Sequence, residues 1–190
     1  MTLVRHPEDP KPFRLTLDDY RVLHQAGAFD RGPKVELIEG VILQMNPQRN
    51  SHSFAKTELA FRLREKLREI DSPFRAIVEP TIALSRDSAP EPDIALTSDG
   101  PRDDYIALDT VALLVEVSST TITYDLGPKA ALYAASGVPE YWVLEIHKGV
   151  LHRHWSPREG GYSEQDAVPL GDRIESVTIP ALAVESDGLI

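Results

Sequence analysis

The positions of hydrophobic residues along the chain predict alternating strands and helices. From Ser51 to Ile70, apolar residues recur at about every fourth position, which is typical of a helix with one face packed on a sheet. Short apolar runs bounded by glycine, proline and charged residues predict strands before and after this helix. We expect these strands at residues 35–38, 41–45, 74–84, 92–97, 111–117, 140–146 and 150–155. The pattern is that of an α/β fold.

Proline content and a capping signal predict where the ordered chain begins. Residues 1–12 contain three prolines and are expected to form a flexible N-terminal arm. Thr16 can cap a short helix that ends at Gly27. We therefore expect a single domain at residues 13–190, whose tail from Gly161 onward forms edge strands and loops.

An acidic residue interrupts an apolar run that predicts a buried strand. Glu116 lies within the sequence VALLVEV at residues 111–117. Burying an ionised carboxylate is costly unless the group is paired, hydrogen-bonded or bound to a cation. Glu116 is therefore a candidate either for a buried salt bridge or for a functional site.

Two further charged residues are expected near Glu116. Asp93 stands at the start of an expected strand, and sites in α/β sheets commonly lie at strand ends. Lys129 falls in the first turn of the helix after the Glu116 strand, which we expect Asp125 to cap and Pro128 to open. A lysine at this end opposes the helix dipole. It is either a solvated residue or one held there by a function.

Two carboxylates and one lysine can together hydrolyse a phosphodiester. The chain has no cysteine, which excludes disulfides and thiolate zinc sites. Oxygen ligands favour Mg²⁺ or Mn²⁺, and Mg²⁺ is usually held by one or two carboxylates. Such an ion activates water, while the lysine can orient the water and stabilise charge on the phosphate.

Several short motifs follow one another along the chain. They are VELIEG at 35–40, His52 at the start of a helix, EPD at 91–93, VEV at 115–117, Tyr124-Asp125 with Lys129, LYA at 132–134 and GVPEYW at 137–142. No single motif is specific. In this order, however, they resemble the PD-(D/E)XK nuclease superfamily, and within it the bacterial Uma-type family of proposed restriction endonucleases. The resemblance implies an α/β fold with a restriction-endonuclease-like core, in which helices flank a mixed central β-sheet.

The resemblance also implies roles for individual residues. Asp93 and Glu116 correspond to the metal ligands, and Lys129 corresponds to the base that orients the attacking water. Glu36 and His52 match further family positions near the site and are accessory candidates. The implied activity is Mg²⁺-dependent or Mn²⁺-dependent endonucleolytic cleavage of DNA, a hydrolysis of ester bonds.

The chain departs from the superfamily pattern at two positions after Glu116. The superfamily lysine usually stands two residues after the glutamate, where this chain has Ser118. In the Uma-type family a lysine on the following helix is thought to replace it, which is the place of Lys129. Ser119 stands where relatives often have an acid, so the resemblance assigns this loop no role in metal binding.

The net charge argues against tight binding of a polyanion. The chain carries 20 Lys and Arg against 30 Asp and Glu, a formal charge of -10 at pH 7, whereas non-specific DNA binding relies on basic residues. The helix expected from Ser51 to Ile70 has an excess of basic residues. Either it is an ordinary solvated helix, or Lys66 and Arg68 form a weak nucleic-acid-binding face. We expect DNA as a low-affinity partner and leave a homodimer open.

A second interpretation is a non-catalytic interaction module that keeps the nuclease fold and binds a protein partner through its acidic surface. The net charge favours this alternative, whereas the set of two acids and a lysine favours the enzyme. A glycosidase with two carboxylates would give Lys129 no task. The N-terminus lacks the apolar region of a signal peptide, and no stretch of about 18 apolar residues is present. We therefore expect a cytoplasmic protein with no membrane partner.

Overall fold

The side chains of the central strands alternate between two hydrophobic layers. The structure is a computed structural model that describes residues 11–190. In β7 (Val111–Ser118), Leu113 and Val115 belong to the layer that includes α2 (Asn50–Glu69), whereas Leu114 belongs to the opposite layer. Successive strand residues point to opposite faces. A strand that is buried along its whole length therefore supplies both layers.

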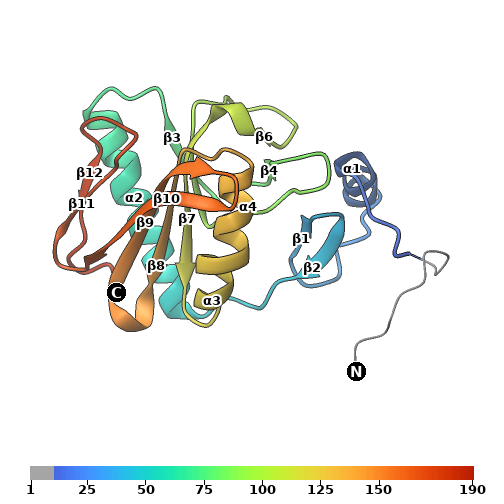
Figure 1. Ribbon diagram of the computed structural model, residues 1–190, viewed down its shortest axis with the longest axis horizontal. Coiled ribbons are helices and arrows are strands. Elements are labelled where there is room, and N and C mark those ends of the chain that lie inside the picture. Colours follow the sequence, from blue (N-terminus) through green and yellow to red (C-terminus); the bar gives the residue numbers. More distant parts are fainter. Residues whose placement is uncertain (1–10) are drawn as a thin grey trace.

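Six strands form the central sheet, in the order β10-β9-β8-β7-β5-β3. β7 and β8 are parallel, and the other neighbouring pairs are antiparallel. The remaining strands of this sheet are β3 (Arg75–Val78), β5 (Ile94–Thr97), β8 (Glu140–Glu145), β9 (Val150–Arg158) and β10 (Gly161–Pro169). The expected mixed sheet flanked by helices is confirmed, since α2 and α4 (Ala130–Ala135) cover its two faces (Figure 1).

The layer on the α2 side is completed by the C-terminal part of the chain. The apolar spacing predicts the burial of Ala55, Leu59, Leu63 and Leu67, which is confirmed, whereas Ile70 at its end is only partly buried. A two-stranded sheet of β11 (Arg173–Glu175) and β12 (Ala183–Glu185) lies beside α2 in Figure 1 and adds to the same core.

The first helix and the first two strands of the described chain belong to a smaller unit at one side of the sheet (Figure 1). It contains α1 (Leu17–Gln25) and the hairpin of β1 (Val35–Ile38) and β2 (Val41–Gln44). Thr16 caps α1 in a capping box with Asp19. The small core of this unit includes Tyr20, Leu37 and Ala89, all with no exposed surface.

The single strand expected at residues 74–84 is divided in two. β3 ends at Val78, and β4 (Ile82–Ala83) instead pairs with β6 (Ile106–Ala107) in a separate two-stranded sheet. Glu79 has a φ of 51°, which extended backbone does not allow, and the following proline has no N–H to donate. The chain therefore leaves the central sheet at this point.

The helix expected to begin at Asp125 begins earlier. α3 (Ile122–Tyr124) continues through a π-helical turn at Asp125–Lys129 into α4, so Asp125 is not its cap and Pro128 does not open it. A proline inside a helix lacks the N–H of the regular ladder and clashes with the carbonyl four residues earlier. The wider π turn accommodates Pro128, and such turns are frequent at functional sites.

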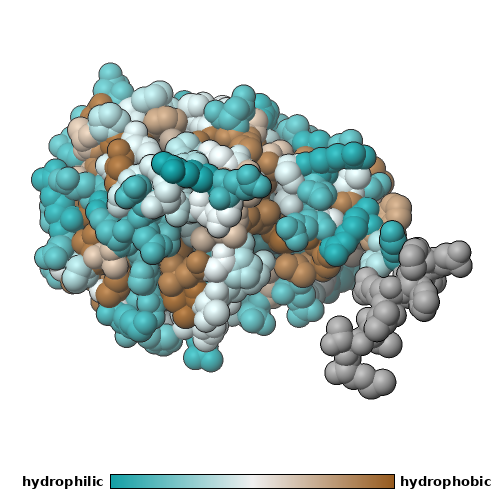
Figure 2. Space-filling view, in the orientation of Figure 1, coloured by the Kyte–Doolittle hydropathy of each residue, from teal (hydrophilic) through white to brown (hydrophobic). Residues whose placement is uncertain are grey.

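The remaining described elements are short. Two 3-10 turns lie at Leu108–Thr110 and Ile146–Lys148. Hydrophilic residues cover much of the face shown in Figure 2, with hydrophobic residues exposed between them. No helix among residues 11–190 has the length and apolar content to cross a membrane. The arm predicted for residues 1–12 lies almost wholly outside the described part of the chain.

Candidate active site

Asp93 and Glu116 face each other across two neighbouring strands. In the antiparallel pair of β5 and β7, Ile94 is opposite Val115, and continuing this register by one residue beyond the start of β5 places Asp93 beside Glu116. Side chains at such opposed positions point to the same face of the sheet and lie close together. The N–H of Val117 donates to Asp93 Oδ2 at 2.8 Å, which fixes this arrangement.

One oxygen of Glu116 is held by two side chains from the helical run after β7. Lys129 Nζ lies 2.9 Å from Glu116 Oε1, and the hydroxyl of Tyr133 donates to the same atom at 3.0 Å. Lys129 and Tyr133 are four residues apart, which places them on one helix face. None of the described residues donates a hydrogen bond to the second oxygen, Oε2.

Glu36 approaches Lys129 from the other side. Its Oε1 lies 3.4 Å from Lys129 Nζ, and its Oε2 is buried without a hydrogen-bond partner. Alternation along β1 explains the position of Glu36, because Leu37 next to it points into the N-terminal core. The lysine is 2% exposed and bridges two buried glutamates.

The N-terminal part of α2 and the segment before it surround Asp93. His52 Nε2 lies 3.1 Å from Asp93 Oδ2, and Gln48 donates to Oδ1 at 3.2 Å. Lys56 Nζ is 3.7 Å from Oδ1 and 2.7 Å from Glu79 Oε1. Asp93 is thus surrounded by donors, in contrast to the half-free carboxylate of Glu116.

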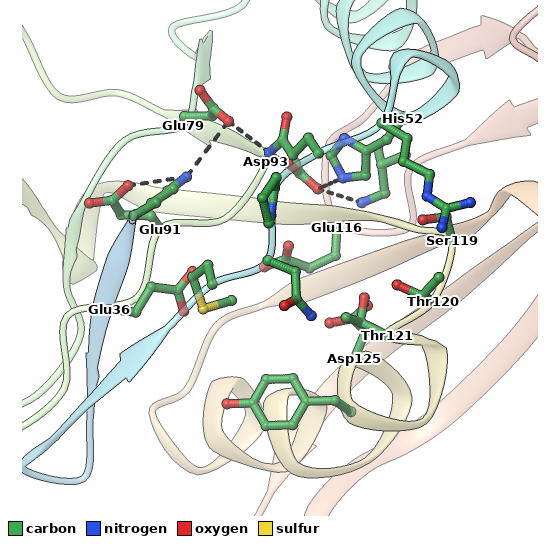
Figure 3. A pocket seen from close by; sticks show the side chains of 18 of the residues that line it. Glu36, His52, Glu79, Glu91, Asp93, Glu116, Ser119, Thr120, Thr121 and Asp125 are labelled. Carbon is green, nitrogen blue, oxygen red and sulfur yellow. Dashed lines mark hydrogen bonds and ion pairs between the residues drawn. The ribbon is translucent and has the colours of Figure 1, made fainter. Parts of the chain in front are cut away.

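Most of these groups, although not Lys56 or Tyr133, line a pocket of about 520 Å³. In Figure 3, Glu36, Glu79 and Glu91 lie on one side of it, with Asp93 and Glu116 in the middle of the view. Ser119, Thr120, Thr121 and Asp125 are on the other side, and His52 is near Asp93. The pocket therefore gathers residues from β1, α2, β7, the helical run after β7 and the segment before β5.

Burial and crowding of acids shift the protonation of the pocket residues. Burial, with the charges of Asp93, Glu36 and Asp125, raises the pKa of Glu116 to about 8 against the opposing effect of Lys129. Burial likewise raises the pKa of Glu36 and of Asp125. For Lys129, burial lowers the pKa, but Glu116 and Glu36 outweigh it and the net shift is upward. The lysine is thus a strongly held cation among acids.

The acids fit a divalent cation held by few protein ligands. No group of three His, Cys, Asp or Glu residues in the described chain forms a ready metal cluster. Mg²⁺ typically uses one or two carboxylates and several waters. Glu36 Oε2 is buried without a partner, and the pKa of Glu116 is raised first by burial and then by the neighbouring acids, whose negative charge a bound cation would offset. Asp93 and Glu116 could hold such an ion between opposed strands.

Comparison with protein families decides the classification of the chain. Residues 17–185 match the Uma2 family, which is described as "Putative restriction endonuclease". The chain belongs to the Uma2 family. The resemblance inferred from the ordered motifs is therefore confirmed at the level of the family.

Uma2 membership agrees with a structural likeness. The fold is similar to the crystal structure of "a putative nuclease belonging to DUF820" from Anabaena variabilis ATCC 29413. The TM-score is 0.62 at 18% identity, over 85% of this chain and 89% of that chain. At this identity the likeness shows the fold alone. No curated protein matched the chain.

The structure of this Uma2 chain brings five of the seven predicted site residues together. All five line the pocket: Asp93, Glu116, Lys129, Glu36 and His52. Lys66 and Arg68 lie near the other end of α2, and Lys66 is about 21 Å from His52 along the helix axis at the usual rise per residue. Lys66 pairs with Glu69 at 3.0 Å. These two basic residues are not part of the pocket.

Sequence reasoning missed several residues around the Uma2 pocket. The missed residues are Lys34, Gln48, Lys56, Glu79, Glu91, Asp125 as a pocket wall, and Tyr133. Two of them carry a readable signal, because Asp125 and Tyr133 stand four residues before and after Lys129 on one helical run. Lys34 and Glu79 carry no such signal, because only the tertiary fold brings them to the pocket.

Proposed function

We propose that this protein is a divalent-metal-dependent endonuclease that hydrolyses phosphodiester bonds of DNA. Membership of the Uma2 family and the nuclease-like fold support a nuclease. The observation that carries the proposal is the position of Asp93 opposite Glu116 in one pocket, with the Lys129 ammonium 2.9 Å from Glu116. Two acids and an ammonium group in one pocket match the chemistry of phosphoryl transfer to water.

Asp93 and Glu116 would hold Mg²⁺ or Mn²⁺. When bound, the ion would lower the pKa of water and neutralise charge on the phosphate oxygens. Asp93 is kept in position by the Val117 N–H and by His52. Glu116 is kept in position by Tyr133 through Oε1, so that Oε2 remains free of described donors in a residue that lines the pocket. The accessory role of His52 is therefore to orient the ligand Asp93.

Lys129 would act as a cation in the reaction. The neighbouring carboxylates raise its pKa above the ordinary value of a lysine, so the ammonium keeps its proton at neutral pH. A protonated Lys129 can donate hydrogen bonds to the attacking water and to the phosphate as charge develops. We assign it orientation and charge stabilisation, and the proton of the water goes to solvent.

The proposed reaction breaks one ester bond. The oxygen of water forms a new bond to phosphorus, and one P–O bond to the sugar breaks. The leaving sugar oxygen gains a proton, so that the products are a phosphate monoester and a free hydroxyl end. No oxidant, reductant or second substrate is required.

The experiment is a cleavage assay with site variants and exposed control variants. Purified protein with Mn²⁺ or Mg²⁺ should cleave DNA at low salt, because basic contacts are few and salt screens them. Asp93→Asn and Glu116→Gln should reduce cleavage to background. Lys129→Ala should lower kcat by about 10²- to 10³-fold, the usual cost of losing one group that stabilises transition-state charge.

The control variants remove the same residue types from exposed positions outside the pocket: Asp103→Asn, Glu159→Gln and Lys148→Ala. These should keep wild-type cleavage. Full activity in Glu116→Gln would show that the cleavage comes from a contaminant. Absence of cleavage with either metal would favour the interaction module instead.

A further inference from the structure

The groups assigned to catalysis are recessed below the protein surface. Glu36 and Lys129 are 2% exposed, and Asp93 and Glu116 are 6% exposed. Exposed lining residues are found at the mouth of the pocket, in the Asn46–Arg49 segment before α2 and at Thr120 after β7. A phosphate must therefore pass these two segments before it can reach the acids.

The pocket has the size of a site for one small molecule. Its volume of about 520 Å³ lies within the range of about 300–1,000 Å³ for small-ligand sites. A base-paired and stacked duplex does not fit into such a space, and enzymes with enclosed sites act on single strands or on nucleotides taken out of the stack.

The charge of the pocket wall also disfavours a duplex lying across the mouth. The acids of the wall are Glu36, Glu79, Glu91, Asp93, Glu116 and Asp125, against the cations Lys34, Arg49 and Lys129. Lys34 is already paired with Glu91 at 3.1 Å. A duplex binds mainly through phosphate contacts to Lys and Arg, of which this wall offers few, whereas an unpaired nucleotide can also bind through its base.

The same wall offers contacts to a base. Tyr124 lines the pocket and is partly exposed, which allows a base to stack on its ring. Asn46, Gln48 and Thr120 place polar side chains at the mouth, where base edges can form hydrogen bonds. Stacking does not depend on net charge, so it suits an acidic protein.

We propose that the pocket takes an unpaired nucleotide, so that single strands, overhangs and flaps are cleaved in preference to continuous duplex. The inference rests on the proposed function, because it needs the phosphodiester to be the substrate. Tyr124 is the stacking surface, and the acids below it meet the phosphate next to the stacked nucleotide.

The test compares three forms of one labelled oligonucleotide: single strand, blunt duplex, and duplex with an unpaired tail. With Mn²⁺, the single strand and the tail should be cut at least about 10-fold faster than the duplex, because the duplex must first be unpaired. Binding is measured separately by fluorescence anisotropy in Ca²⁺, where the single strand should have the lower Kd. Equal or faster cleavage of the duplex would overturn this inference and leave the nuclease proposal intact. Failure to cleave any of the three forms would overturn both.

Two substitutions test the stacking role. Tyr124→Leu should raise the Kd for the single strand by about fivefold or more, because it removes the ring. Tyr124→Phe keeps the ring and should restore nearly wild-type binding. Both effects should be absent for the duplex. An unchanged Kd in Tyr124→Leu, with the circular dichroism of the wild type, would overturn the assignment of Tyr124.

Discussion

Glu116 in β7 and Glu140 in β8 are buried glutamates on neighbouring parallel strands, but their carboxylates have different surroundings. Both oxygens of Glu140 accept hydrogen bonds. The donors are the Trp142 indole N–H, the Ser176 and Thr178 hydroxyls and the N–H groups of Val177 and Thr178. Glu116 receives its two contacts on one oxygen only. Both residues are buried, but of the two only Glu116 lines a pocket and has an oxygen without a described hydrogen-bond donor.

The comparison separates a structural acid from a candidate catalytic acid. Uncharged donors can stabilise a buried carboxylate as well as an ion pair does, and they leave nothing for a ligand to bind. Glu140 holds the Ser176–Thr178 segment against the sheet. Glu116 instead shares its pocket with Asp93, Glu36 and Lys129, so its negative charge is available to a cation.

The largest expected effect is on folding stability, when the same substitution is made at both positions. In Glu140→Gln the NH₂ group of the new amide must face hydrogen-bond donors, because both oxygens of the wild-type carboxylate accept hydrogen bonds. We expect a loss of about 3–4 kcal/mol in the free energy of unfolding. In Glu116→Gln the amide can face the pocket while its oxygen keeps Lys129 and Tyr133, so the change should stay within about 1 kcal/mol. Urea unfolding measures both, and equal losses would contradict the comparison.

The stabilisation by metal should rank the two variants in the opposite order, with the larger loss in Glu116→Gln. Mg²⁺ or Mn²⁺ at about 100 times its Kd should stabilise the wild type by about 2.7 kcal/mol, seen as a higher Tm. Glu140→Gln should keep this shift although its Tm is lower. Asp93→Asn and Glu116→Gln should lose the shift, whereas the exposed Glu159→Gln should keep it. A shift that survives in Glu116→Gln would place the metal elsewhere on the acidic surface.

The sequence could predict the two strands but not the difference between their glutamates. Both acids interrupt apolar runs, and apart from Trp142 the donors to Glu140 come from residues more than thirty positions later. Likewise, Lys129 and Glu36 are 93 positions apart, so their ion pair depends on the complete fold. The periodic spacing of α2 predicts the burial of Ala55, Leu59, Leu63 and Leu67, because that signal is local, but it does not predict the burial of His52, Lys56 and Ala60.

The errors of sequence interpretation also have local causes. The sequence predicts Pro128 in the first turn of a helix, which is the commonest place for a proline in a helix. In the structure it lies inside a π-helical turn, which the residue pattern does not distinguish. The strand expected at residues 74–84 is predicted from apolar residues on both sides of Glu79. The pattern of apolar residues does not reveal the left-handed backbone conformation of Glu79, which ends β3.

A smaller effect is expected in the pH dependence of stability. The pKa of Glu116 is raised from 4.5 to about 8 in the folded protein. Between these values the unfolded chain releases the proton that the folded protein retains, so stability falls as pH rises from about 4.5 to about 8. Below about pH 4.5 Glu116 is protonated in both the folded and the unfolded state, so it no longer lowers the stability of the fold.

The variant Glu116→Gln isolates this contribution, because the amide does not titrate. We expect the difference in unfolding free energy between wild type and Glu116→Gln to move against the wild type between pH 5 and pH 8, by at most about 1.4 kcal/mol for each pH unit. Chemical unfolding without metal at several pH values measures it. A constant difference would mean that Lys129 keeps Glu116 ionised throughout the range.

The smallest expected effect concerns the hydroxyl that positions Glu116. Tyr133 is buried and donates to Glu116 Oε1 at 3.0 Å, just as the Trp142 indole donates to Glu140 Oε1 at 2.7 Å. Tyr133→Phe removes only this donor, which leaves the carboxylate freer to rotate about Lys129. We expect a loss of about 1 kcal/mol in stability and about a tenfold rise in the Kd for Mn²⁺, the lower end of the range for residues that orient metal ligands. Trp142→Phe removes the corresponding donor from Glu140 and should lower stability without changing the Kd. Titration calorimetry with Mn²⁺ distinguishes the two variants, and an equal Kd in Tyr133→Phe and Trp142→Phe would assign Tyr133 to packing alone.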